Sequence, residues 1–154
     1  MDVKVDTAEL KRFQDKLKNL DAIQTDKFFK DACKGLGGRY LALVIPATPA
    51  KTGFLRRGWT GGTDQNSTTY AESLPADRVG FGYTIQITNT AEYASYVENG
   101  HRQTPGRYVP AIGKKLKASW VNGKFFQKNS ETALAGIAPG FLQALLDAYL
   151  ARGF

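Results

Sequence analysis

The chain has 154 residues, 42% apolar and 12% aromatic, which is enough for one hydrophobic core and excludes large-scale disorder. Cys33 is the only cysteine and His101 the only histidine, so an internal disulfide and a Cys/His zinc site are both excluded. Residues 1–5 lack the apolar core of a signal peptide, and no run approaches about 20 apolar residues, so we expect synthesis in the cytoplasm and no membrane partner.

The net charge of +7 is unevenly distributed along the chain. Residues 61–100 carry one basic and five acidic residues, whereas residues 101–128 carry seven basic residues and no acidic one. Opposite potentials on one chain favour head-to-tail contacts between copies, and such contacts can close into rings. The alternative is that both stretches form solvated surface loops, and the charges alone do not decide between the two.

Two helices are predicted before residue 45. Residues 7–20 carry apolar side chains at spacings of three and four, preceded by a sequence that resembles a capping box. Residues 25–44 repeat the same pattern, and Cys33 falls on the apolar stripe, where we interpret it as a core residue. Gly35, Gly37 and Gly38 weaken the middle of this helix, so either another element packs closely there or the helix bends.

Pro46 and Pro49 are expected to end the second helix. Residues 55–60 can then begin a strand, and the polar residues 61–76 predict a flexible loop or hairpin tip. Residues 78–90 alternate in the clearest strand pattern of the chain, with one apolar face made of Val79, Phe81, Tyr83, Ile85 and Ile87.

A short helix over residues 92–98 is predicted next, with Thr90 as its N-cap and Gly100 as its end. Residues 101–124 predict a basic, loop-rich segment with short strands. Residues 125–135 are expected to be helical, and Pro139 suits the first turn of a last helix. The order predicts a single α+β domain over residues 1–154, with a small antiparallel sheet packed against two N-terminal helices and a C-terminal helix.

The sequence contains no phosphate-binding Gly-Lys-Ser/Thr loop, dinucleotide fingerprint, paired-carboxylate motif or His-Glu-x-x-His helix. We therefore expect no cofactor, no metal and no enzymatic activity. Glu98 lies close enough to His101 in sequence to suggest a general acid/base pair. No second catalytic candidate accompanies them, so we assign no catalytic residue and favour a hydrogen-bonded or exposed loop histidine.

Three segments resemble a known family. Residues 48–59, Thr-Pro-Ala-Lys-Thr-Gly-Phe-Leu-Arg-Arg-Gly-Trp, are similar to a Pro-x-x-Thr-Gly-x-Leu-Arg-x-Ser/Gly pattern. Residues 89–101, Asn-Thr-Ala-Glu-Tyr-Ala-Ser-Tyr-Val-Glu-Asn-Gly-His, are similar to an Asn-x-x-x-Tyr-Ala-x-x-Val/Ile-Glu-x-Gly signature. Residues 123–126, Gly-Lys-Phe-Phe, resemble its closing segment. The chain thus resembles the phage morphogenesis proteins of the head-tail junction, called neck, head-tail joining or tail-completion proteins.

The motif residues divide into structural and interface candidates. Gly53 permits a tight turn and Thr52 can bond the local backbone, while Gly100 ends a helix. The expected packing anchors are Leu55, Trp59, Tyr93, Tyr96 and Val97. Arg56 and Glu98 could pair within the subunit or across an interface. The full set of interface candidates is Arg56, Arg57, Trp59, Glu98, His101, Arg102 and Arg107.

The resemblance implies a structural protein of the virion that works in a homo-oligomeric ring, with six as the suggested copy number. Its implied partners are a head-closure or connector protein and a tail tube or tail terminator protein. The alternative is a small nucleic-acid-binding protein, since the basic segment also carries Tyr108, Trp120, Phe125 and Phe126. The sequence leaves open whether this segment makes non-specific DNA contacts or meets an acidic protein.

Overall fold

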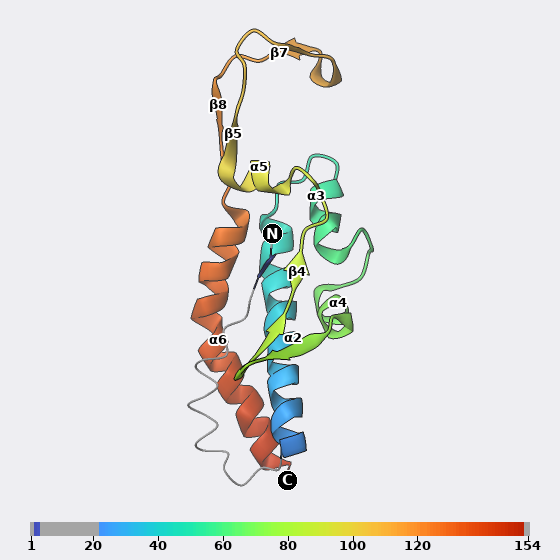
Figure 1. The fold of residues 1–154 in the computed structure, drawn as a ribbon, viewed down its shortest axis with the longest axis vertical. Coiled ribbons are helices and arrows are strands. Elements are labelled where there is room, and N and C mark those ends of the chain that lie inside the picture. The colour runs from blue at the N-terminus through green and yellow to red at the C-terminus, as the bar shows by residue number, and fades with distance from the viewer. Residues whose placement is uncertain (1, 4–21, 153–154) are drawn as a thin grey trace.

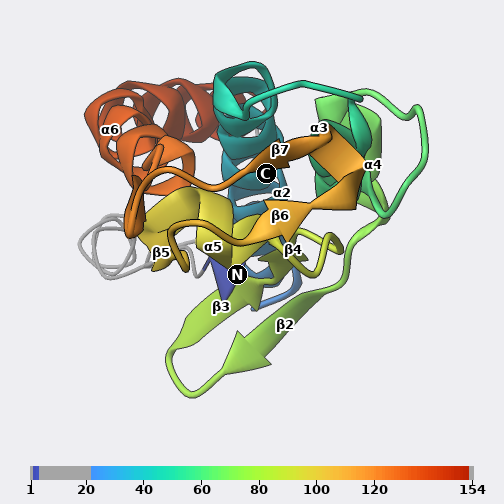
Figure 2. The same cartoon turned by 90° about the horizontal axis from the view of Figure 1, so that it is seen from above.

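Two long antiparallel helices form the body of the molecule in the computed structural model, which describes residues 2–3 and 22–152. Helix α2 (Ala22–Ala47) and helix α6 (Phe126–Ala151) lie side by side, and the short helix α4 (Ser67–Ser73) packs on the other side of α2 (Figures 1 and 2). Short strands cover one face of this helical layer. The predicted helix over residues 7–20 lies outside the described residues.

Helix α2 stays continuous through its glycines because a different element approaches each one. A Cβ on Gly35 would lie 2.3 Å from the Phe141 ring of α6, and one on Gly37 would lie 3.2 Å from Ile85 of strand β3. Gly38 faces α4, and a Cβ on Gly38 would lie 3.5 Å from the Thr68 Cα of that helix. Of the two predicted explanations, close packing is confirmed. The glycines let three elements approach the axis of one helix.

The segment after α2 is helical, so the predicted strand over residues 55–60 is wrong. Helix α3 (Phe54–Arg57) leads directly into a 3₁₀ turn, η1 (Gly58–Thr60). Gly53 precedes it at φ 77°, a conformation that favours glycine. The helix α2 itself ends one residue beyond Pro46, and the Thr48 hydroxyl donates a 2.6 Å hydrogen bond back to the Val44 carbonyl.

The predicted flexible loop over residues 61–76 contains the ordered helix α4, so the loop interpretation is wrong there. The Asn66 side chain caps this helix by accepting a 2.8 Å hydrogen bond from the Thr69 amide. Ala71 is fully buried against α2. The Ser and Thr residues that look like a loop in sequence are stabilised as a helix by packing on the glycine surface of α2.

The predicted strand over residues 78–90 is three strands. Strands β2 (Ala76–Val79) and β3 (Gly82–Ile85) pair antiparallel around a turn at Gly80, which has φ 63°. Strand β4 (Ile87–Thr88) then pairs antiparallel with strand β1 (Asp2–Val3). Of the predicted apolar face, Tyr83, Ile85 and Ile87 are buried, but Val79 at the end of β2 and Phe81 in the turn are 62% and 88% exposed.

Helix α6 is one helix, although two were predicted. Pro139 lies inside it on the exposed side, while Leu134, Leu142 and Leu146 are buried on the side that faces α2. By length and composition α6 is also apolar enough to cross a membrane, so the expectation that no segment approaches a span needs correction. One helix of this kind is weak evidence of a membrane span, and only 17% of its apolar window is buried within the described structure.

A polar cluster joins the first turns of α2 to the last turns of α6. Lys27 Nζ lies 2.9 Å from Asp31 Oδ2, and the Tyr149 hydroxyl also donates a hydrogen bond to this carboxylate. Burial, followed by the bond to Asp31, raises the pKa of Tyr149. The cluster holds the two long helices together at the end far from the motifs.

The α+β class, with antiparallel strands packed against helices, is confirmed.

The single thiol of the chain is predicted to be inert in the folded protein. Cys33 is fully buried, its Sγ lies 3.5 Å from the Tyr83 carbonyl oxygen, and burial raises its pKa to about 11. At about pH 8, where an exposed thiol reacts readily, a disulfide reagent should leave the native chain unmodified. The same reagent should titrate one thiol after unfolding in guanidinium. Rapid reaction of the native protein would contradict the buried position.

Candidate assembly interface

The first two sequence motifs meet in space at Asn89. The Asn89 side-chain amide donates a 2.8 Å hydrogen bond to the Leu55 carbonyl, and its Oδ1 accepts a 2.9 Å bond from the Ala91 amide. Gly58 makes this contact possible, because a Cβ there would lie 2.2 Å from Asn89 Oδ1. Two segments more than 30 residues apart are thus locked together by the residues that define the motifs.

Arg56 stabilises the carboxyl end of α2. Its Nε donates a 2.7 Å hydrogen bond to the Thr48 carbonyl, and its Nη2 donates a 3.1 Å bond to the Pro46 carbonyl. A cation at this end satisfies carbonyls that have no partner in the helix and complements the helix dipole. Of the two predicted pairings with Glu98, the one within the subunit is therefore wrong, since both groups bond elsewhere.

Glu98 caps the amino end of α6. Helix α5 (Ala94–Asn99) carries this residue, which is only 5% exposed. Its two carboxylate oxygens accept hydrogen bonds of 2.9 and 3.0 Å from the amides of Gln127 and Lys128. A buried anion at a helix amino terminus satisfies amides without partners in the helix and is favoured by the dipole. Glu98 is thus a structural cap, and its carboxylate is bound to α6 instead of orienting His101.

Trp59 is also a structural residue and not a surface one. Its side chain is 0% exposed, its indole Nε1 donates a 2.9 Å hydrogen bond to Thr48 Oγ1, and its ring makes edge contacts with Tyr40 and Phe126. The ring therefore joins η1 to both α2 and α6. Trp59 was predicted as a packing anchor between the sheet and the short helix; it is a buried packing residue, but its ring contacts α2 and α6, and no part of it is exposed for the predicted interface.

The motifs expose a second set of side chains at the same end of the molecule. Phe54 and Tyr93 stack with their ring centroids 6.1 Å apart and are 53% and 42% exposed. Tyr96 is 59% exposed and contacts the His101 ring edge-on at 5.9 Å. We call Phe54, Arg57, Tyr93, Tyr96 and His101 the motif face, of which His101 is the half-buried member. Tyr93 and Tyr96 were predicted as packing anchors; Tyr93 packs on Phe54, but both side chains are largely exposed.

Buried partners lie directly under this face. Leu55 is 5% exposed and Val97 is half-buried, and with Tyr93 they line a hollow of about 140 Å³ bounded by residues 49–53. The Thr52 hydroxyl accepts a long, 3.4 Å bond from the Phe54 amide, as expected of a residue that bonds the local backbone. The Thr90 amide donates a hydrogen bond to the Gly58 carbonyl. Thr90 is not the N-cap of α5, as was predicted, because that helix begins at Ala94.

A two-stranded ribbon rises from the end of α5 and returns to α6 (Figure 1). We call residues 100–124 the arm. Its strands are β5 (Gly100–Arg102), β6 (Tyr108–Val109), β7 (Lys114–Lys115) and β8 (Trp120–Asn122), with a 3₁₀ turn η2 (Pro110–Ile112) at the tip. Short strand pieces were predicted here, and they are confirmed.

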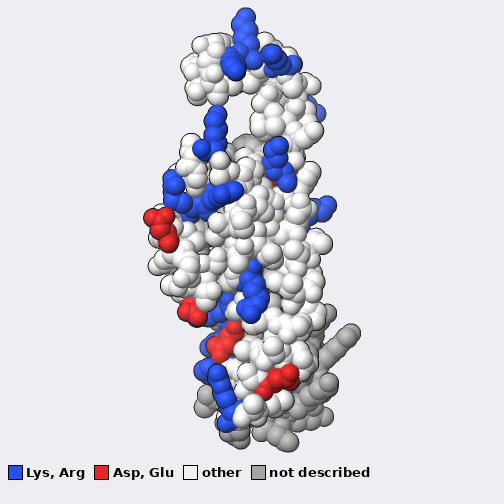
Figure 3. Space-filling view, turned by 180° about the vertical axis from the view of Figure 1, so that it is seen from behind, with Lys and Arg blue, Asp and Glu red and all other residues white. Residues whose placement is uncertain are grey.

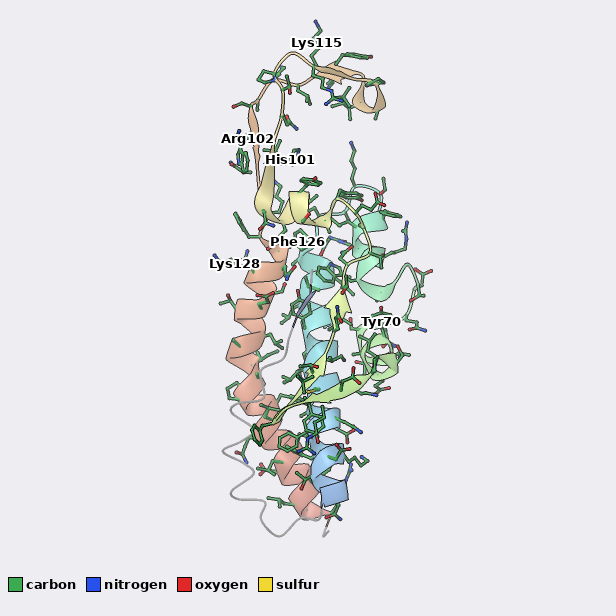
Figure 4. All side chains as sticks on the ribbon, viewed as in Figure 1. Tyr70, His101, Arg102, Lys115, Phe126 and Lys128 are labelled. Atoms are coloured by element: carbon green, nitrogen blue, oxygen red, sulfur yellow. The ribbon has the colours of Figure 1, made fainter. Side chains whose placement is uncertain are left out.

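The base of the arm is tightly closed. Gly100, at φ 83°, ends α5 as predicted, and a Cβ on it would lie 2.4 Å from the Val121 carbonyl oxygen. A Cβ on Gly123 would lie 2.2 Å from the Glu98 carbonyl oxygen. His101 and Arg102 lie at this base, and Lys115 lies at the far tip (Figure 4). Arg102 and Arg107 are both exposed, as interface candidates must be.

Within the described residues, no group of three His, Cys, Asp or Glu side chains could hold a metal. The carboxylate nearest to His101 in sequence is committed to the amides of α6, so the hypothesis of a Glu98–His101 acid/base pair is contradicted. What the site offers is a rigid surface with exposed aromatic and basic side chains.

The comparisons with known proteins agree with the motifs. No curated protein and no solved structure matches the chain. Residues 11–100 match the model of the HK97-gp10-like family, described as tail components of bacteriophages. The matched region spans both motifs that meet at Asn89, and it covers more than half of the chain. This chain is therefore a member of the HK97-gp10-like family of bacteriophage tail components, which are structural proteins.

Proposed function

We propose that this chain is a neck or tail-completion subunit that forms a homo-oligomeric ring at the head-tail junction. In this role it binds a head-closure or connector protein on one side and a tail tube or tail terminator protein on the other. It is made in the host cytoplasm, becomes part of the virion and acts by binding alone. Membership of a bacteriophage tail-component family supports the general part of this proposal, that the chain is a structural protein of the virion.

The motif face is the observation that supports assembly by this surface. Phe54, Tyr93 and Tyr96 are each at least 42% exposed although they lie near one another. Exposed apolar groups rimmed by charge mark surfaces that become buried in a partner, and aromatic and arginine side chains contribute most to such interfaces. Arg57, at the rim of the face, and Arg102 and Arg107 on the arm are exposed cations suited to partner recognition.

The face is also held rigid before any partner binds. Asn89 fixes α3 to the start of α5, and Glu98 fixes the end of α5 to α6. Because a preordered surface loses little conformational entropy on binding, this arrangement suits a subunit that must dock in one defined orientation.

The proposal is tested by light scattering coupled to size-exclusion chromatography. The unmodified chain is run alone and then with purified tails that lack their head-proximal end. We expect either a ring or saturable attachment to those tail ends. The double variant Tyr93→Ser/Tyr96→Ser should lose this assembly while keeping its fold, because both side chains are largely solvent-exposed in the monomer.

The matched control lies on the outward side of α6. Ile137 is 45% exposed, comparable with Tyr93, but it is distant from the motifs in sequence and belongs to another surface. Ile137→Ser should assemble as the unmodified chain does. If Ile137→Ser abolishes assembly and the motif-face variant does not, the interface is on α6. If the unmodified chain binds neither itself, heads nor tails, the assembly role is wrong.

A further inference from the structure

The arm carries a concentrated, uncompensated positive charge. All six of its basic residues are exposed, and residues 101–128 contain no acidic residue. The six are Arg102, Arg107, Lys114, Lys115, Lys117 and Lys124. Within the described residues, the ion pairs are Lys27 with Asp31 and Lys30 with Asp26, both on α2. Lys and Arg without acidic neighbours mark the tip of the arm in Figure 3.

The shape of the arm suits a groove in a polyanion. It is an antiparallel ribbon in which Gly100 pairs with Asn122 at the base and Val109 pairs with Lys114 near the tip. Consecutive side chains of a strand point to opposite faces, so Lys114 and Lys115 place charge on both sides of the ribbon. The major groove of duplex DNA, about 12 Å wide, admits a two-stranded ribbon of this kind.

The arm lacks a core that would stabilise it alone. Tyr108, Ile112 and Trp120 are between 48% and 56% exposed, and none of residues 100–124 is fully buried. A two-stranded ribbon without a packed face is marginally stable in water. The closed base positions the arm, and contact with a partner would order the remainder.

An acidic protein surface is the less favoured partner. Four of the six cations are lysines, which are depleted at protein interfaces but serve well as phosphate contacts. A second copy of the chain is the competing partner, because Asp64, Glu72, Asp77 and Glu92 of residues 61–100 are exposed, whereas Asp26 and Asp31 are paired with lysines and Glu98 is buried.

We propose that the arm binds the sugar-phosphate backbone of duplex DNA without reading its sequence. This inference goes beyond the assembly role and does not depend on the motif face. The arm cations neutralise phosphates and release their counterions, so affinity must fall steeply with salt. Six contacts predict a slope of about −5 in log K against log salt, and about a thousandfold loss between roughly 50 and 200 mM salt.

Fluorescence anisotropy with a labelled duplex about 30 base pairs long measures this slope. The variant Lys114→Gln/Lys115→Gln/Lys117→Gln should flatten the slope by about 2 to 3, since each lost phosphate contact removes about one unit. The control Lys51→Gln/Arg78→Gln/Arg152→Gln removes the same charge from exposed positions outside the arm. Its slope should stay near that of the unmodified chain.

Trp120 provides a second readout on the arm itself. It is 49% exposed on β8, whereas Trp59, the other tryptophan, is fully buried. Acrylamide should quench the emission of Trp120 selectively, and bound DNA should reduce that quenching. Trp120→Phe should remove the quenchable component, which assigns the signal to the arm.

Three results would overturn the proposal. The first is an equal loss of slope in the arm variant and the charge-matched control, since the net charge would then explain the binding. The second is unchanged DNA binding by the arm variant. The third is tighter binding of the arm to polyglutamate than to DNA at the same salt, which would assign an acidic protein as its partner.

Discussion

Replacement of Trp59 with alanine is expected to lower the free energy of unfolding by about 3–5 kcal/mol, the range for loss of a buried large aromatic. The side chain is completely buried and contacts Tyr40 of α2 and Phe126 of α6. Its removal therefore opens a cavity where three elements meet, and the rigid core can fill only part of it. Urea unfolding followed by circular dichroism measures the change.

Two further variants separate packing from hydrogen bonding. Trp59→Phe keeps a ring but loses the bond from Nε1 to Thr48, and should be destabilised by about 1 kcal/mol through that bond, with a further packing loss from the smaller ring. Trp120→Ala removes the exposed tryptophan of the arm and should change stability by less than about 0.5 kcal/mol. A Trp59→Ala variant as stable as Trp120→Ala would contradict the buried position.

Replacement of Glu98 with alanine is expected to lower the free energy of unfolding by about 2–4 kcal/mol. The amides of Gln127 and Lys128 would lose charged acceptors at 2.9 and 3.0 Å, and unsatisfied donors in a partly buried site are unfavourable. The first turn of α6 should then fray, which loosens the adjoining base of the arm. Hydrogen exchange of these two amides should become faster than that of amides in the middle of α6.

Glu98→Gln is the matched isosteric variant. The Gln carbonyl oxygen can accept one of the two amide hydrogen bonds, but its NH₂ group cannot accept the other. The free energy of unfolding of Glu98→Gln should therefore lie between those of the unmodified chain and Glu98→Ala. Glu92→Ala is the surface control, since Glu92 is exposed in the same acidic segment, and it should have little effect. Unchanged amide exchange in Glu98→Ala would show that the cap does not hold the start of α6.

Both variants concern residues that looked like interface candidates in the sequence. Trp59 and Glu98 belong to the segments that resemble the family, and both side chains are buried, so they stabilise the surface from beneath. A loss of assembly in either variant would therefore report unfolding of the face. The variants Tyr93→Ser and Tyr96→Ser are better tests of binding, because those side chains contact solvent.

Local patterns in the sequence determined much of the secondary structure. The spacing of apolar residues predicted most of α2 and the helical character of residues 125–150, and Gly100 marked the end of α5. The position of Cys33 on the apolar stripe predicted its burial correctly. These features follow from periodicity and from backbone conformation, which neighbouring residues control. The motifs likewise identified the family without any three-dimensional information.

Only the tertiary structure decided which partner each motif residue contacts. Glu98 could have met Arg56 or His101, yet its carboxylate binds amides almost 30 residues further along the chain. The loop-like residues of α4 become helical because α2 offers a surface of glycines to pack on. Such contacts join residues distant in sequence, and local propensity is too weak to specify them. The sequence by itself therefore determined the long helices and the charge of the arm, whereas long-range packing decided which motif residues are buried and which form the motif face.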